Sequence, residues 1–201
     1  NHFQALRFRE SMLSATTAEV LAEKNEIDPE VGFSCGVLRQ LGLTLIAWNY
    51  PRVFSRAMET MKPQETLDFV LQRGLGFSPA LLGLTFARRW NLSEEILVAL
   101  GDRKPSSQSG TNKAVGKDDA YRKVGEVLAK LCEVGEALAR ANNPEHYPNA
   151  LRDWQDAEEA IAAHLGPKGM NTIFERAELH CQEYLKLNPE ITKFTPTENL
   201  K

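Results

Sequence analysis

The sequence predicts an all-α protein, and three kinds of observation predict it. Apolar residues recur at intervals of three and four positions in almost every segment, which is the helical period. No two alternating segments are joined by a hairpin turn. The pairs Asp28-Pro29 and Ser78-Pro79 combine a capping residue with a proline, a signal that is typical of a helix start.

The first half of the chain divides into six predicted helices. Pro51 ends the second helix and begins the third, whereas Pro63 ends the third and offers a start to the fourth. In the fifth, the small residue Gly83 is expected to allow close approach to a neighbouring helix. Ser93 is expected to cap the sixth helix and Gly101 to stop it. The expected ranges are residues 3–23, 29–50, 51–61, 64–74, 79–90 and 94–100.

A polar segment separates these helices from the rest of the chain. Residues 105–117 are rich in Ser, Gly and Lys and lack apolar periodicity, so we expect a linker or surface loop there. Beyond it the apolar spacing predicts one long amphipathic helix and two shorter ones, at residues 118–142, 149–164 and 171–187. The expected organisation is a helical domain at 1–104, the linker, and a C-terminal helical extension at 118–201.

The composition argues against several classes of partner. A hydrophobic fraction of 42% with 25% charged residues is typical of a globular protein, and a net charge of -3 gives no bias toward nucleic acid. No apolar run reaches the length of a membrane span, and the polar first residues do not form a signal peptide. Three widely separated cysteines suit a reducing compartment. We therefore expect a cytoplasmic protein with no nucleic-acid partner and no membrane partner.

Three stretches of the first half share a pattern with one known family. In LRFRESMLSA the sequence is similar to an aromatic-x-His-Ser helix, with Glu10 at the histidine position. In FSCGVLRQLG it is similar to a Phe-x-x-Gly-Leu-Leu-His-Asp-Ile-Gly helix, with Arg39 and Gln40 at the His-Asp positions. In GFSPALLGLTFARRWNLSEEILVAL, Pro79 stands at another usual histidine. In this order the stretches resemble the HDOD domain, a bacterial signalling relative of the HD phosphohydrolases, over roughly residues 3–104.

The resemblance implies an HD-domain-like multi-helical bundle, followed here by the C-terminal helical extension. The matched stretches correspond to the second half of the family pattern. The first half is therefore expected upstream in a longer chain, or is missing from a reduced variant. The resemblance also implies that Glu10, Arg39 and Gln40 share a vestigial cleft.

An HD phosphohydrolase holds its metal ions with histidine and carboxylate side chains, which this cleft largely lacks. Metal-assisted hydrolysis needs several such ligands around one or two cations. A guanidinium at Arg39 repels a divalent cation, Gln40 is a weak neutral ligand, and Pro79 has no side-chain donor. We therefore expect no catalytic residue, no metal and no cofactor.

The leading hypothesis is a non-catalytic regulatory module that acts through contacts with other signalling proteins, or through a small ligand in the old cleft. A free Arg39 would bind an anionic ligand, whereas an ion pair of Arg39 with Glu10 would be structural. One alternative is a residual metal-dependent phosphohydrolase acting on nucleotides. Another is a helical adaptor or a homo-oligomer that associates through the helix at 118–142.

Other polar and aromatic residues leave two interpretations each. Trp48 suits either core anchoring or a partner contact, because aromatic residues dominate both. Arg88 and Arg89 either complement the end of their helix or form a partner or anion patch. His180 and Cys181 are not expected to share a metal, since neighbours in a helix point about 100° apart.

Overall fold

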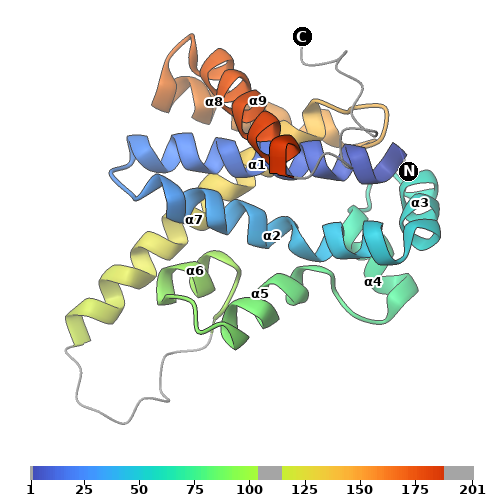
Figure 1. Ribbon diagram of the computed structural model, residues 1–201, viewed down its shortest axis with the longest axis horizontal. Coiled ribbons are helices and arrows are strands. Elements are labelled where there is room, and N and C mark those ends of the chain that lie inside the picture. The colour runs from blue at the N-terminus through green and yellow to red at the C-terminus, as the bar shows by residue number, and fades with distance from the viewer. Residues whose placement is uncertain (1, 104–114, 188–201) are drawn as a thin grey trace.

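The structure is a computed structural model, which describes residues 2–103 and 115–187, with the backbone alone at 115–118 and 187. Within these ranges every regular element is a helix, which confirms the all-α prediction (Figure 1). In chain order the helices of the described ranges are α1 (His2–Lys24), α2 (Pro29–Asn49), α3 (Pro51–Thr60), α4 (Leu67–Leu75), α5 (Ala80–Arg89), α6 (Glu94–Ala99), α7 (Val115–Ala141), α8 (Ala150–Leu165) and α9 (Gly169–Leu187).

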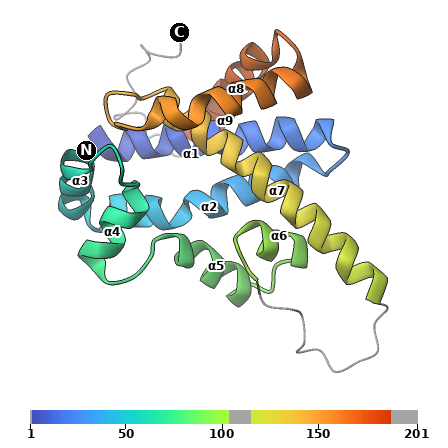
Figure 2. The same ribbon diagram turned by 180° about the vertical axis from the view of Figure 1, so that it is seen from behind.

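Helices α1 and α2 form the centre of the bundle. Figure 1 shows α1 between α2 on one side and α8 and α9 on the other, and in Figure 2, the view from the opposite side, α7 crosses in front of them. The two central helices approach closely because small residues face each other. A Cβ atom at Gly36 would lie 2.5 Å from the Cα atom of Ala15, so only glycine fits at this crossing.

Three predicted helix boundaries are confirmed, two starts and one stop. The Asp28 carboxylate accepts a hydrogen bond of 2.9 Å from the backbone N–H of Glu30, and Pro29 is the first residue of α2. Pro51 begins α3 as predicted. Gly101 has a φ of 91° just after α6, which confirms the predicted stop, since this left-handed conformation favours glycine.

Two predicted starts are wrong in detail. Helix α4 begins at Leu67 rather than after Pro63, because the Thr66 hydroxyl caps it by accepting from the N–H of Phe69 at 3.3 Å. Ser78 does not cap α5 but donates its hydroxyl hydrogen to Asp68 at 3.0 Å. The other oxygen of Asp68 accepts from the backbone N–H of Ala80 at 3.1 Å, so a residue of α4 holds the start of α5.

The three C-terminal helices share their core with the first two. Residues from α1, α2, α6 and α7 form one buried cluster, which includes Leu21, Cys35, Ala99, Leu128 and Cys132. A second cluster joins α1 with α7, α8 and α9. Most of the predicted linker at 105–117 lies outside the described residues, and its last three positions belong to α7.

Among the described helices, α2 alone is long and apolar enough to cross a membrane by length and composition. This is weak evidence, because a core helix of a globular protein has the same character. Here α2 packs against α1, α5 and α7. It also carries Arg39 and Gln40 toward a polar cavity. The absence of a membrane partner stays a prediction.

Candidate functional site

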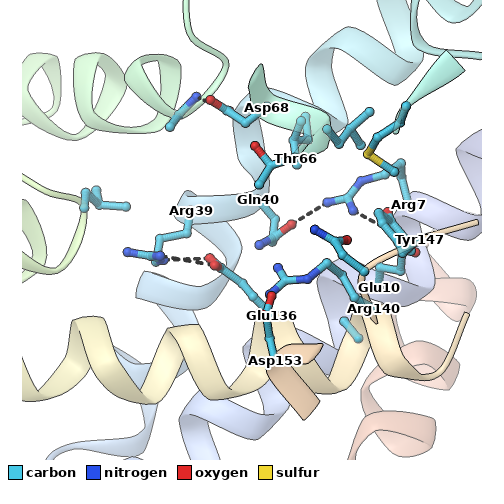
Figure 3. Close-up of a pocket in the computed structure, with 17 residues that line it drawn as sticks. Arg7, Glu10, Arg39, Gln40, Thr66, Asp68, Glu136, Arg140, Tyr147 and Asp153 are labelled. Carbon is cyan, nitrogen blue, oxygen red and sulfur yellow. Dashed lines mark hydrogen bonds and ion pairs between the residues drawn. The ribbon is translucent and has the colours of Figure 1, made fainter. Parts of the chain in front are cut away.

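A cavity of about 310 Å³ lies where α1, α2, α4 and α7 meet the connection that leads into α8 (Figure 3). The three residues predicted to share a cleft, Glu10, Arg39 and Gln40, all line it. The remaining polar residues of its wall are Arg7, Thr66, Asp68, Glu136, Arg140, Tyr147, Asn149 and Asp153. The predicted grouping is therefore present, and residues from the C-terminal helices complete it.

Glu10 is a buried residue of the cavity wall, with an exposed fraction of 2%. It forms an ion pair with Arg7, which lies three residues earlier on the same face of α1. It also accepts hydrogen bonds from the Tyr147 hydroxyl at 2.8 Å and from the Asn143 amide at 3.4 Å. Glu10 is thus held by three donors, two of which come from the C-terminal part of the chain.

Arg39 makes a different ion pair from the one considered from the sequence. Its Nε and Nη2 atoms donate to the two carboxylate oxygens of Glu136 on α7, at 2.7 and 3.2 Å. Its Nη1 atom donates to the backbone carbonyl of Ala99 at the end of α6, at 3.0 Å. The hypothesis of an Arg39–Glu10 pair is therefore wrong, because Arg7 is closer to Glu10 along α1 and Glu136 offers Arg39 a two-pronged partner.

Gln40 is fixed by its contact with Arg7. The Oε1 atom of Gln40 accepts a hydrogen bond from Nη2 of Arg7. Because a guanidinium can only donate, the amide oxygen must face Arg7 and the amide nitrogen must face away from it. Figure 3 shows the Gln40 side chain between Arg7 and Arg39, with its oxygen toward Arg7.

Burial and charge act against each other at these groups. Burial raises the pKa of the Glu10 carboxyl above its ordinary value, and the contacts with Arg7 and Tyr147 only partly offset this shift. Burial opposes the charge on Arg7, but Glu10 and Tyr147 outweigh it, so the pKa of Arg7 is raised. Burial likewise opposes the charge on Arg39, and Glu136 again leaves its pKa raised. Both guanidinium groups therefore stay charged in the cleft.

The comparison with known families decides the relationship. The family model of the HDOD domain matches residues 3–103, which is half of the 201-residue chain. The chain belongs to the HDOD family. One solved structure is similar: a crystal structure of a Shewanella amazonensis protein named "putative phosphohydrolase", with 18% sequence identity and a TM-score of 0.40. The match covers 84% of this chain and 63% of that one. No curated protein is similar enough in sequence to count as a match.

The cleft of this HDOD domain does not fit the metal ions of an HD phosphohydrolase. In the described ranges no group of three or more His, Cys, Asp or Glu side chains could hold a metal ion. The carboxylate of Glu10 is bound by Arg7, and that of Glu136 by Arg39. Each guanidinium would also stand beside the cation and repel it. These side chains are therefore not available as ligands for a catalytic metal ion.

The predicted contact residues lie apart from the cleft of the HDOD domain. Trp48 has an exposed fraction of 41%, so it lies at the surface near the end of α2 rather than in the core. Arg88 forms an ion pair of 2.8 Å with Asp102 just beyond α6, and Arg89 is exposed. His180 contacts Glu19 at 2.8 Å rather than sharing a ligand with Cys181. A role of Trp48, Arg88 and Arg89 in partner contacts stays a prediction.

Sequence reasoning missed the partners that fill the cleft. The contact of Arg7 with Glu10 could have been predicted, because Arg7 precedes Glu10 by three residues on a predicted helix. Glu136 and Arg140 are four residues apart on the long helix, but only the folded chain brings them to Arg39 and Asp153. Tyr147 lies in an irregular connection, where periodicity gives no orientation.

Proposed function

We propose that this HDOD domain is a non-catalytic regulatory module of a signalling pathway. The observation that carries the proposal is the state of its cleft. The residue at one histidine position, Glu10, is paired with Arg7, and the residue at the metal-binding His position of α2, Arg39, is paired with Glu136. Arginine–carboxylate pairs thus occupy the positions from which an HD phosphohydrolase would hold metal.

The energetics of these pairs argue against a residual hydrolase. To bind a cation, Glu10 would have to give up Arg7, whose guanidinium is buried with an exposed fraction of 3%. Leaving one member of a buried pair without its partner costs about 3–5 kcal/mol. The freed guanidinium would in addition repel the cation. A rearrangement toward a metal centre is therefore unfavourable for two reasons, the broken ion pair and the repulsion of the cation.

As a regulatory module, the protein would act in the cytoplasm through contacts with other signalling proteins or through a small ligand in the cleft. Surface residues such as Trp48 and Arg89 are available for the first mode, because both side chains are exposed. The cavity between α1, α2 and α7 is available for the second.

The test is metal content together with phosphodiester hydrolysis. The purified protein is incubated with manganese and magnesium, desalted, and measured by inductively coupled plasma mass spectrometry. Hydrolysis of bis(para-nitrophenyl) phosphate is followed in parallel for the wild type and for Glu10→Gln. We expect no stoichiometric metal and no turnover that depends on Glu10. One or two metal ions per chain, with turnover that is lost in Glu10→Gln, would overturn the proposal.

A further inference from the structure

The carboxylates of the cavity wall have no oxygen without a donor. Glu10 accepts from Arg7, Tyr147 and Asn143, and Glu136 accepts from Arg39 at both oxygens. Asp68 accepts from Ser78 and Ala80, and Asp153 from Arg140 and Arg152. These carboxylates therefore do not need a hydrogen-bond donor from a ligand.

Arg140 has the largest unused donor capacity in the wall. A guanidinium has five N–H groups. Among the described residues Arg140 makes one hydrogen bond, from Nη2 to Asp153 at 3.3 Å, and it also interacts electrostatically with Glu10. Asp153 has a second cation, since its other oxygen accepts from Nε of Arg152 at 3.1 Å. Arg140 can thus leave Asp153 for a ligand without stranding that carboxylate.

Gln40 supplies the second unused donor. Its oxygen is committed to Arg7, which leaves the two N–H groups of the amide without an acceptor among the described residues. The side chain has an exposed fraction of 7%, and it lines the cavity. Its amide nitrogen is not among the fully enclosed side-chain atoms without a partner, so it faces open space where a ligand oxygen can accept from it.

Charge and size limit what can supply that acceptor. Three arginines and four carboxylates line the wall, and Arg152 balances the fourth carboxylate from outside it. Because this set of charges has no positive excess, it would not hold a polyphosphate, and the free N–H groups of Arg140 are the local attraction for a single negative charge. The volume of about 310 Å³ is at the small end of ligand pockets. The remaining wall is apolar, formed by Leu43, Met61, Leu67, Ala80, Leu100 and Ala139.

We infer that the cleft binds a small molecule with a single oxyanion group on an apolar body, with Arg140 and Gln40 donating to the oxyanion. This rests on the proposed function, in which the cleft binds rather than hydrolyses. The oxyanion is a carboxylate or a phosphodiester, since both offer one negative charge and at least two acceptor oxygens. Arg39, which the sequence favoured as the anion-binding residue, spends three of its N–H groups on Glu136 and Ala99.

The test is a titration of the ¹⁵N-labelled full chain, followed by amide chemical shifts near neutral pH. The probes are hexanoate and dibutyl phosphate, with hexanol as the uncharged control. We expect saturable shifts at residues around the cavity with at least one of the anions and none with hexanol. The anion that binds identifies the oxyanion class. Saturation with neither anion, or equal binding of hexanol, overturns the inference.

Two pairs of variants assign the site to Arg140. Arg140→Gln should weaken binding about tenfold or more, because it removes a charge-assisted hydrogen bond. Arg122→Gln, which removes the same charge from a half-buried position of α7 outside the cavity, should leave the affinity unchanged. Asp153→Asn should tighten binding several-fold by removing the competing carboxylate, whereas Asp156→Asn, at an exposed position of the same helix, should not.

The outcomes separate this inference from the proposed function. Equal affinities for Arg140→Gln and the wild type, or equal tightening by Asp153→Asn and Asp156→Asn, overturn the assignment to Arg140. The absence of binding by both anions overturns the inference and leaves the proposed function standing on its own test. Metal-dependent cleavage of bound dibutyl phosphate would confirm the site and overturn the non-catalytic function.

Discussion

The Tyr147 hydroxyl donates a hydrogen bond of 2.8 Å to Glu10, across a sequence separation of 137 residues. Both groups are buried, with exposed fractions of 4% and 2%. The contact joins the connection before α8 to the middle of α1. The C-terminal helices therefore complete the polar cleft that the HDOD pattern of α1 and α2 only begins.

Replacing Tyr147 by Phe should destabilise the protein by about 1.5–3 kcal/mol, because the hydrogen bond goes to a charged group that stays buried. The free energy of unfolding is measured by urea denaturation. Tyr121→Phe is the matched control, since Tyr121 is half exposed on α7, and its effect should be close to zero. Equal stabilities of the two variants would show that the hydroxyl of Tyr147 does not hold the cleft together.

Replacing one member of the Arg7–Glu10 pair should destabilise the protein more than replacing both. Arg7→Met leaves a buried carboxylate without its cation, which costs about 3–5 kcal/mol. The double replacement Arg7→Met with Glu10→Leu removes both charges and should recover most of this loss. The three stabilities are compared by urea unfolding. A double variant that is as unstable as the sum of the single variants would contradict a coupled pair.

More of the helices than of the cleft could be predicted from the sequence, because helix signals are local and most contacts of the cleft are not. A capping residue such as Asp28 accepts a hydrogen bond from the backbone N–H two residues later, so its partner can be predicted from the local sequence. The cleft is assembled from α1, α2 and α7, and Glu136, which binds Arg39, and Tyr147, which binds Glu10, lie 97 and 137 residues away in the sequence. The family resemblance predicted that Glu10 and Gln40 lie in one cleft, whereas no local sequence signal indicated Arg140.

Two glycines at the contact of α2 with α5 should not tolerate alanine. A Cβ atom at Gly83 would lie 2.2 Å from the carbonyl oxygen of Leu38, and one at Gly42 would lie 1.9 Å from that of Pro79. Both contacts are with backbone, so the helices must move apart. We expect each change to destabilise by about 1–3 kcal/mol or more, as other overpacked cores do.

Gly74→Ala is the control for these glycines, and it should stabilise the protein rather than destabilise it. Gly74 lies within α4, and nothing stands within 4 Å of the added Cβ atom. Alanine should therefore stabilise the helix by about 0.5–1 kcal/mol. Thermal unfolding of the three variants checks both directions. A destabilising Gly74→Ala together with a neutral Gly83→Ala would refute the packing of α5 against α2.

The cysteines should react slowly and in a fixed order. All three are free, and burial raises the pKa of the Cys35 thiol to about 12 and that of the half-buried Cys181 thiol to about 11. Burial also raises the pKa of Cys132, which is fully enclosed. Because the thiolate is the nucleophile, about one Cys181 in a thousand is reactive at about pH 8.

Iodoacetamide treatment of the native protein, followed by mass spectrometry, measures this order. Cys181 should be labelled first, with a rate that rises about tenfold per pH unit until the pH approaches its pKa. Cys35 and Cys132 should be labelled only when the protein unfolds, because both side chains are inaccessible. Cys181→Ser should abolish native labelling. Rapid labelling of Cys35 in the folded protein would mean that α1, α2 and α7 do not enclose it.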